Sequence, residues 1–404
     1  MSDALSPAGL RQLHDLMAAH LTSGRMPGLI ALVARGDDVH VDAIGHGAFD
    51  DDRPLARNAI FRIASLSKPI VAAAAMTLIE DGTLRLDQSV DDLLPELADR
   101  RVLRSIGSEL DDTVPAVRSI TVEDLLSYRM GVGTILAMPG TFPYQRAEAE
   151  LRLQSIGGPP WPPGPRDPDS WIAALGTLPL VHQPGEQWMY NTSGQVLGIL
   201  LARAAATDLD SLLTERILGP LAMVDTGFSV PADRRDRLTS FYQPDPETDG
   251  DEPDLLDDRA DSWWAGPPRH PDASGWLVST VDDLWAFASM LRAGGTVDGI
   301  QVLSSGSVAL MTTDRLTDAQ RASASEVFLG EGCGWGLGME VPATGSSGLP
   351  LPWGYGWDGG SGTSWRTNPE TGTTGILLTQ RAMISPQAPK VFDDFWAGVA
   401  AASD

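Results

Sequence analysis

The sequence predicts an α/β (α+β) fold in which an antiparallel sheet flanked by helices is built from both ends of the chain and a mostly α-helical domain is inserted between them. Short β-type runs lie near both ends of the 404-residue chain. The long stretch between them carries mainly helical patterns. We therefore expect a discontinuous sheet domain of residues 1–85 and 275–404, a helical domain of residues 86–274, and an active-site cleft between them.

The first segment predicts a helix followed by a hairpin. Apolar residues at helical spacing indicate a helix over Leu10–Thr22, and the β-rich runs Gly28–Ala34 and His40–Ile44 are joined by a Gly-Asp-Asp turn. An alanine-rich stretch then predicts a buried helix over Ser65–Glu80 that ends at Asp81-Gly82. Ser65 stands at the start of this helix.

The middle of the chain predicts helices and one long loop. Val90–Leu126 is expected to be mostly helical, and Thr121 can cap its last helix. The proline- and glycine-rich tract Gly157–Asp169 predicts a loop over the cleft. Further helices are expected at Ser170–Leu175, Ser193–Ala206, Leu209–Ile217 and Val281–Arg292. Strands at Gly336–Val341, Ser364–Thr367 and Gly375–Gln380, and a final helix at Ala388–Ala402, then complete the sheet domain.

Composition argues against several partners and cofactors. The formal net charge of −25 at pH 7 leaves no basic surface for nucleic acid or a membrane, so neither is expected. The single cysteine excludes an internal disulfide, and the six histidines lack the spacing of a zinc site, so no metal or other cofactor is expected. Without an apolar export segment near Met1, the expected location is cytoplasmic. The oligomeric state stays open.

The chemical signal begins with Ser65-Leu66-Ser67-Lys68. Residues three apart share one face of a helix, so the Ser65 hydroxyl can reach the Lys68 amine and form a nucleophile–base pair. The chain has only two lysines, Lys68 and Lys390, among its 29 basic residues. Arginine could replace a surface lysine, but it cannot lose its proton in a protein. A lysine retained here fits a base, although a surface lysine on a helix is the alternative.

Two further segments can face the same cleft. Tyr190 stands at a junction between a loop and a helix, where its hydroxyl can share a proton with Ser65 or is simply packed in the core. The glycine-rich stretch Gly356–Trp365 precedes a β-type run. A free N–H there can join that of Ser65 as an oxyanion hole, or the glycines can form a tight hairpin without a catalytic duty.

These three motifs, in this order, resemble those of the serine β-lactamase and penicillin-binding superfamily, and most of all its class C β-lactamase-like branch of family VIII carboxylesterases. Flanking segments extend the resemblance over roughly residues 10 to 400. The resemblance implies a β-lactamase-like fold. It also implies Ser65 as nucleophile, Lys68 as its base and Tyr190 as a second proton-transfer group.

Two departures from the family pattern bear on the substrate. The usual Tyr-x-Asn is Tyr190-Asn191-Thr192 here, so Asn191 and Thr192 are candidate substrate-binding residues and Asn191 is a candidate substitute for the missing amide. The usual Lys-Thr-Gly corresponds to Trp357, Asp358 and Gly359, after which Gly360 is placed to donate the second oxyanion N–H. Without that lysine, a cation that holds the carboxylate of a β-lactam or peptide is missing.

The leading hypothesis is therefore an enzyme that hydrolyses esters, or else amides or lactones, of small molecules through an acyl-Ser65 intermediate. The alternatives are acyl transfer to an alcohol or amine, weak β-lactamase or D-aminopeptidase activity, and a non-catalytic binding protein on the same scaffold. Tryptophans can line an apolar acyl pocket, although each can equally belong to the core. The candidates are Trp161, Trp263, Trp264, Trp335 and Trp357.

Overall fold

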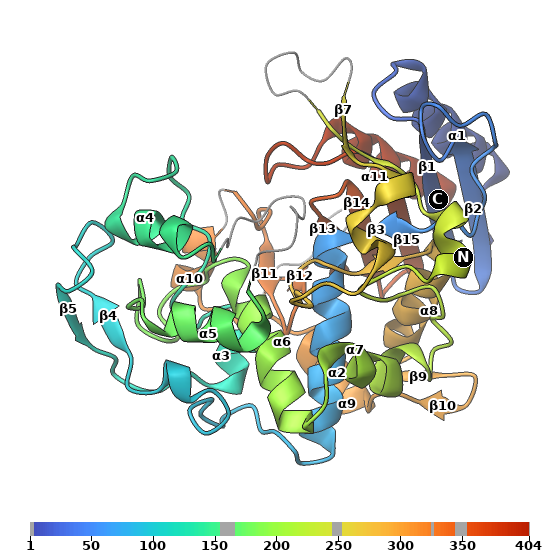
Figure 1. The fold of residues 1–404 in the computed structure, drawn as a ribbon. Helices are drawn as coiled ribbons and strands as arrows, with labels where there is room; N and C mark the ends of the chain where they lie inside the picture. Colours follow the sequence, from blue (N-terminus) through green and yellow to red (C-terminus); the bar gives the residue numbers. More distant parts are fainter. Residues whose placement is uncertain (1–3, 154–165, 245–252, 325–326, 344–353, 404) are drawn as a thin grey trace.

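A seven-stranded antiparallel sheet organises the computed structural model, which describes residues 4–153, 166–244, 253–324, 327–343 and 354–403. Its strand order is β11-β12-β13-β14-β15-β1-β2, so the two chain ends share one sheet, as the sequence predicted (Figure 1). The strands are β1 (Gly28–Arg35), β2 (Asp38–Gly45), β11 (Cys333–Trp335), β12 (Glu340–Pro342), β13 (Tyr355–Gly359), β14 (Thr363–Asn368) and β15 (Thr373–Thr379).

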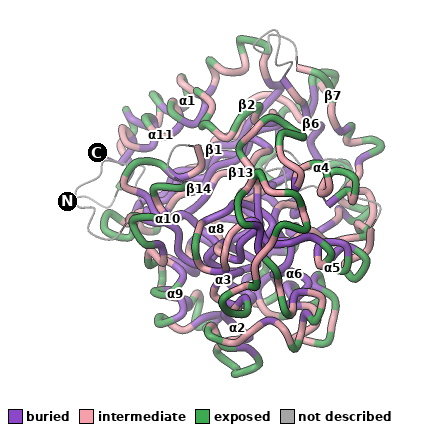
Figure 2. Tube along the Cα trace, turned by 90° about the vertical axis from the view of Figure 1, so that its left-hand side faces the viewer, coloured by how far each residue is buried: buried purple, intermediate pink, exposed green. Residues whose placement is uncertain are grey.

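Strand β1 is buried along its whole length because both faces of the sheet are covered. Side chains alternate along a strand, so Leu29 and Ala31 pack under helices α1 (Pro7–Thr22) and α11 (Lys390–Ser403), while Ile30 joins the larger core on the other face. Figure 2 shows that buried segments lie at the centre of the molecule and exposed segments at its periphery.

The larger core contains α2, which is buried from Ser67 to Leu78 and packs against α6, α7 and α9. In Figure 1, α4, α5, β4 and β5 lie on the opposite side of α2 from α1 and α11.

No helix in the described ranges is both long and apolar enough to cross a membrane. The remaining helices are α2 (Ser67–Glu80), α3 (Val122–Leu126), α4 (Pro143–Glu150), α5 (Pro168–Gly176), α6 (Thr192–Ala205), α7 (Leu209–Leu213), α8 (Val281–Arg292), α9 (Ser305–Met311) and α10 (Asp318–Ala324). Short strands pair as β3 (Phe61–Arg62) with β8 (Val278–Ser279), β4 (Arg101–Leu103) with β5 (Thr113–Pro115), β6 (Phe241–Gln243) with β7 (Asp254–Asp257), and β9 (Thr296–Val297) with β10 (Ile300–Gln301).

The prediction of a mostly helical Val90–Leu126 was wrong. This stretch contains the β4–β5 pair, a single 3₁₀ turn at Pro95–Leu97 and only the short α3. Prolines and β-branched valines favour the paired strands over a continuous helix. Of the predicted strand Gly336–Val341, only Glu340 and Val341 lie in a strand, β12. The preceding residues form the turn between β11 and β12, where Gly338 adopts a left-handed φ of 83°. Helices α4, α9 and α10 were not predicted.

Two other predictions stay predictions. The division into residues 1–85 with 275–404 and residues 86–274 is one of them. The loop over the cleft is the other, since residues 157–165 of the tract Gly157–Asp169 lie outside the described residues. Its last residues, Pro168 and Asp169, already belong to α5.

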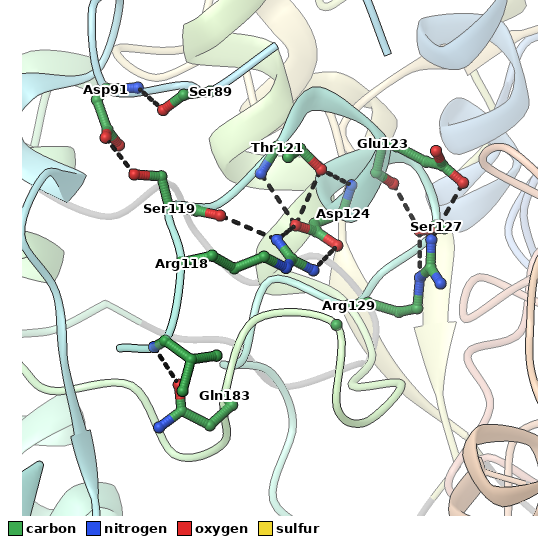
Figure 3. Close-up of polar contacts among 12 residues, drawn as sticks. Ser89, Asp91, Arg118, Ser119, Thr121, Glu123, Asp124, Ser127, Arg129 and Gln183 are labelled. Carbon is green, nitrogen blue, oxygen red and sulfur yellow. Dashed lines mark hydrogen bonds and ion pairs between the residues drawn. The ribbon is translucent and has the colours of Figure 1, made fainter. Parts of the chain in front are cut away.

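The cap at Thr121 is confirmed. The Thr121 hydroxyl accepts from the Asp124 N–H at 3.2 Å, and the Asp124 carboxylate accepts from the Thr121 N–H at 2.9 Å (Figure 3). Arg118 donates to the same carboxylate. These bonds fix the start of α3. Beyond the other end of this helix, Tyr128 adopts a left-handed φ of 61° and stacks on Tyr190.

Candidate active site

Ser65 lies in the 3₁₀ turn Ala64–Leu66 that leads into α2. The helix begins at Ser67 and not at Ser65 as predicted, yet residues three apart also align in a 3₁₀ turn. The turn is fixed from the sheet, because the Thr363 hydroxyl donates to the Ile63 carbonyl at 3.1 Å. Ala64 holds a left-handed φ of 43°, a conformation that an L-residue keeps only when its surroundings impose it.

Lys68 is buried, with 2% of its surface exposed, and its amine donates to three oxygens. These are the Ser65 hydroxyl at 2.8 Å, the Asn191 side-chain carbonyl at 3.0 Å and the main-chain carbonyl of Ser274. Burial lowers the pKa of Lys68 to about 7, while the negative charge of Asp272 acts in the opposite direction. A substantial fraction of this amine is therefore neutral at pH 7 and able to accept a proton.

Tyr190 approaches Ser65 from the other side. Its hydroxyl donates to the Ser65 Oγ at 2.8 Å and accepts from the Trp357 Nε1–H at 2.8 Å. Burial raises the pKa of Tyr190, while its hydrogen bonds with Ser65 and Trp357 act in the opposite direction. The phenol therefore stays protonated at neutral pH. The Lys68 amine, the Ser65 hydroxyl and the Tyr190 phenol are joined in one line by hydrogen bonds.

Asn191, the candidate substitute for the missing amide, contacts Lys68. Its backbone has a φ of 79° and a ψ of −62°, which turns the side chain back so that its oxygen meets Lys68. Thr192 begins α6 and is buried, but its hydroxyl has no hydrogen-bond partner within the described part of the chain. Of the two candidates after Tyr190, the structure brings only Asn191 to Lys68 and Ser65.

The glycine-rich motif divides between the two faces of β13. Trp357 points toward Tyr190. Asp358 points to the other face, where its carboxylate accepts from the Ser364 hydroxyl at 2.6 Å and from Arg366 at 3.1 Å. Gly359 lies against the turn that carries Ser65, since a Cβ on it would stand 2.4 Å from the Ile63 carbonyl oxygen. The Gly360 carbonyl accepts from the Met383 N–H at 2.8 Å.

The candidate tryptophans occupy different places. Trp264 stacks on Trp276 with ring centroids 4.2 Å apart and lies under Arg62, so it belongs to the core. Trp335 is fully buried and meets Trp357 edge-on at 4.7 Å, behind the site. Trp263 is partly buried against Trp264, and Trp161 lies outside the described residues.

Sequence reasoning missed three contributions to the site. These are the Ser274 carbonyl on Lys68, the indole N–H of Trp357 on Tyr190, and Phe328, whose ring stacks on Tyr190 at 4.6 Å. A main-chain carbonyl carries no sequence signal. Among the described residues, no three His, Cys, Asp or Glu side chains gather where they could hold a metal ion.

Comparisons with known proteins identify the family to which this chain belongs. A family profile described as Beta-lactamase matches residues 13–390. Protein Rv1367c of Mycobacterium tuberculosis (strain ATCC 25618 / H37Rv) is 38% identical over 368 residues, which cover 89% of this chain and 86% of that protein. Esterase EstB of Burkholderia gladioli is 27% identical over 389 residues, covering 91% of this chain and 90% of EstB.

The fold also matches a solved structure. That structure, described as EstCE1, a hydrolase with promiscuous acyltransferase activity, aligns with a TM-score of 0.78 at 23% identity, over 97% of this chain and 99% of that one. At this identity the likeness concerns the fold, which is the β-lactamase-like arrangement that the motifs implied. Profile, relatives and fold agree, and the chain belongs to the Beta-lactamase family.

Proposed function

We propose that this protein is a serine hydrolase that cleaves carboxylic esters of small molecules through an acyl-Ser65 intermediate. The observation that carries the proposal is the convergence of the Lys68 amine and the Tyr190 hydroxyl on the Ser65 Oγ, each at 2.8 Å. A buried amine of lowered pKa beside a hydroxyl is the arrangement that activates a serine nucleophile. The resemblance to esterase EstB over most of both chains supports an ester as the substrate.

The first half-reaction forms the acyl-enzyme. Neutral Lys68 takes the Ser65 proton while Oγ attacks the ester carbonyl carbon. The negative charge that develops on the carbonyl oxygen is assigned to the N–H groups of Ser65 and Gly360. Tyr190 then donates its proton to the departing alkoxide, and the Lys68 ammonium returns a proton to the tyrosinate. The ester C–O bond is broken and the alcohol leaves.

Hydrolysis of the acyl-enzyme reverses these roles. A water molecule in the place of the alcohol gives one proton to Tyr190 as it attacks the acyl carbon, while the phenol proton of Tyr190 passes to neutral Lys68. The Lys68 ammonium then protonates the departing Ser65 Oγ, the acyl C–O bond breaks, and the carboxylic acid is released. An alcohol or amine in the same place would give acyl transfer, so the geometry serves both reactions.

The third motif disfavours β-lactams and peptides with a free carboxylate. Trp357 corresponds to the lysine of the Lys-Thr-Gly motif that the family resemblance implies, and its indole N–H donates to Tyr190. Asp358 faces away from Ser65 and is neutralised by Arg366. A neutral ester needs no cation at this position, which ranks esterase activity above β-lactamase or D-aminopeptidase activity.

The test is covalent labelling followed by product analysis. A fluorophosphonate should phosphonylate Ser65 in the wild type and fail in S65A. Label should remain on the same peptide in S67A, because the Ser67 hydroxyl only donates to the Ala64 carbonyl and accepts from the Leu277 N–H. Absence of any Ser65 adduct would revive the non-catalytic binding protein.

Substrate class is tested with p-nitrophenyl esters of increasing acyl length beside a chromogenic cephalosporin. We expect ester turnover to exceed cephalosporin turnover, and the reverse order would overturn the ranking. Free acid as the sole product under excess alcohol identifies a hydrolase, whereas a new ester identifies an acyltransferase.

A further inference from the structure

Asp272 lies in the segment before β8 and organises the backbone next to the candidate base. Its Oδ1 accepts from the Ser274 N–H at 2.7 Å and from the Ser274 hydroxyl at 2.6 Å. Its Oδ2 accepts from the Gln195 Nε2 at 3.0 Å, which ties the segment to α6. Asp272 therefore holds Ser274 by two bonds and is itself held in a fixed orientation.

The Ser274 carbonyl accepts from the Lys68 amine, so Asp272 is connected to Lys68 through one residue. The three oxygens that receive hydrogen bonds from Lys68 belong to a hydroxyl, an amide and a main-chain carbonyl, and none of them carries a formal charge. A buried ammonium with neutral acceptors needs a compensating charge nearby. The carboxylate of Asp272 provides it.

The other titratable groups around this pair are neutral at pH 7 or lie further out. Burial raises the pKa of both Tyr190 and Tyr128, so these phenols stay protonated. Burial lowers the pKa of His270, against the effects of Asp272 and Asp167, so the imidazole is neutral. Asp358 acts on Tyr190 from β13, but its carboxylate is paired with Arg366.

We propose that Asp272 is a positioning residue for Lys68: it fixes the Ser274 carbonyl on the Lys68 amine and supplies a compensating negative charge one residue away. The inference rests on the proposed role of Lys68 as the base of Ser65. On this inference, Asp272, a residue outside the Ser65–Lys68–Tyr190 group, helps to set the pH range over which Lys68 can act as a base.

Direct titration of Lys68 tests this without turnover. The chain contains only Lys68 and Lys390, so labelling lysine with ¹³C at the ε carbon gives two resonances. Lys390, three-quarters exposed and paired with Asp394, is the internal reference. In the wild type we expect Lys68 to titrate near pH 7, in line with its lowered pKa of about 7.

The variants separate charge from hydrogen bonding. D272N and D272S can both still accept from the Ser274 N–H but carry no charge, so the Lys68 midpoint should fall by about half to one pH unit. D87N removes one charge from an exposed site and should leave the midpoint in place. D272E, which keeps the charge, should stay close to the wild type.

A Lys68 midpoint unchanged in both D272N and D272S would overturn the inference. Failure of Ser65 to acylate would instead overturn the proposed function and would leave the NMR result standing, so the two failures are distinguishable. In an active enzyme, the acidic limb of the kcat/KM profile should move with the NMR midpoint. A merely structural role of Asp272 would lower kcat without moving either.

Discussion

Replacement of Trp357 by phenylalanine isolates the hydrogen bond from its indole N–H to the Tyr190 hydroxyl. In the resting enzyme this is a neutral bond of 2.8 Å. In the proposed mechanism Tyr190 gives its proton to the leaving alkoxide, so the same N–H then donates to a tyrosinate and the bond becomes charge-assisted. Only the gain between these two states accelerates the reaction.

The size of the effect follows from that difference. A neutral buried hydrogen bond contributes about 1 kcal/mol and one to a charged group about 1.5–3 kcal/mol, so the transition state loses about 0.5–2 kcal/mol more than the ground state. At 1.36 kcal/mol per factor of ten, W357F should lower kcat by roughly 2- to 30-fold. An ethyl ester should lose more than the p-nitrophenyl ester of the same acid, because nitrophenolate leaves without a proton.

Trp335 provides the matched control. It is buried in the same aromatic cluster, 4.7 Å from Trp357, and its Nε1 has no hydrogen-bond partner within the described residues. W335F therefore removes a similar volume without this bond. Steady-state kinetics on both esters should separate the variants, with thermal unfolding as the check on folding. Equal kcat values for W357F and W335F, or equal losses on the two esters, would refute the reasoning.

Four further outcomes are expected. Because neutral Lys68 is the proposed base and its pKa is about 7, kcat/KM for a neutral ester should fall as the pH drops below about 7 in a pH–rate profile. N191G, which suits the left-handed backbone but removes the amide, should lower kcat about tenfold, while T192V should stay within about twofold. The pKa of Lys68 is lower in the folded than in the unfolded chain, so from about pH 7 to 10.5 the wild type should gain about 1.4 kcal/mol per pH unit over K68M in denaturant unfolding. D257A leaves buried Arg62 without its carboxylate, which should cost about 3–5 kcal/mol and lower the Tm by about 5 °C in calorimetry.

Each of these outcomes has a clear contrary. A pH-independent rate below pH 7 would exclude Lys68 as the titrating base. Equal activities of N191G and T192V would mean that the Asn191 amide is dispensable. A stability difference to K68M that stays constant with pH would show a normally titrating lysine. An unchanged Tm in D257A would mean that the Arg62 pair is not buried as described.

The sheet and its flanking helices could be predicted because their residues carry strong local signals. Gly28–Ala34 and Gly375–Gln380 are apolar runs of strand length, and they pair as β1 and β15. The stretch Val90–Leu126 could not be assigned correctly, because three-residue strands such as β4 and β5 are too short for a periodic pattern and depend on pairing with each other. Local periodicity does not contain that information.

At the site, spacing alone placed Lys68 beside Ser65, because three residues along a turn is a local relation. The amide of Asn191 could be named as a candidate, but its contact with Lys68 depends on a φ of 79° that the sequence does not specify. The opposite directions of Trp357 and Asp358 follow from strand register. Register is set by the neighbouring strands and cannot be derived from the motif itself. Trp357 therefore faces Tyr190, while the adjacent Asp358 faces Arg366.

The position of β15 between β1 and β14 has a consequence for biosynthesis. The hairpin β1–β2 is made first, yet β1 reaches the rest of the sheet only through residues 373–379, which leave the ribosome about 340 residues later. Until then β1 is an apolar strand with one unpaired edge, a template for pairing with other chains. We expect nascent chains that stop short of β15 to depend on chaperones, and Ser65 to become reactive only after β15 has joined the sheet.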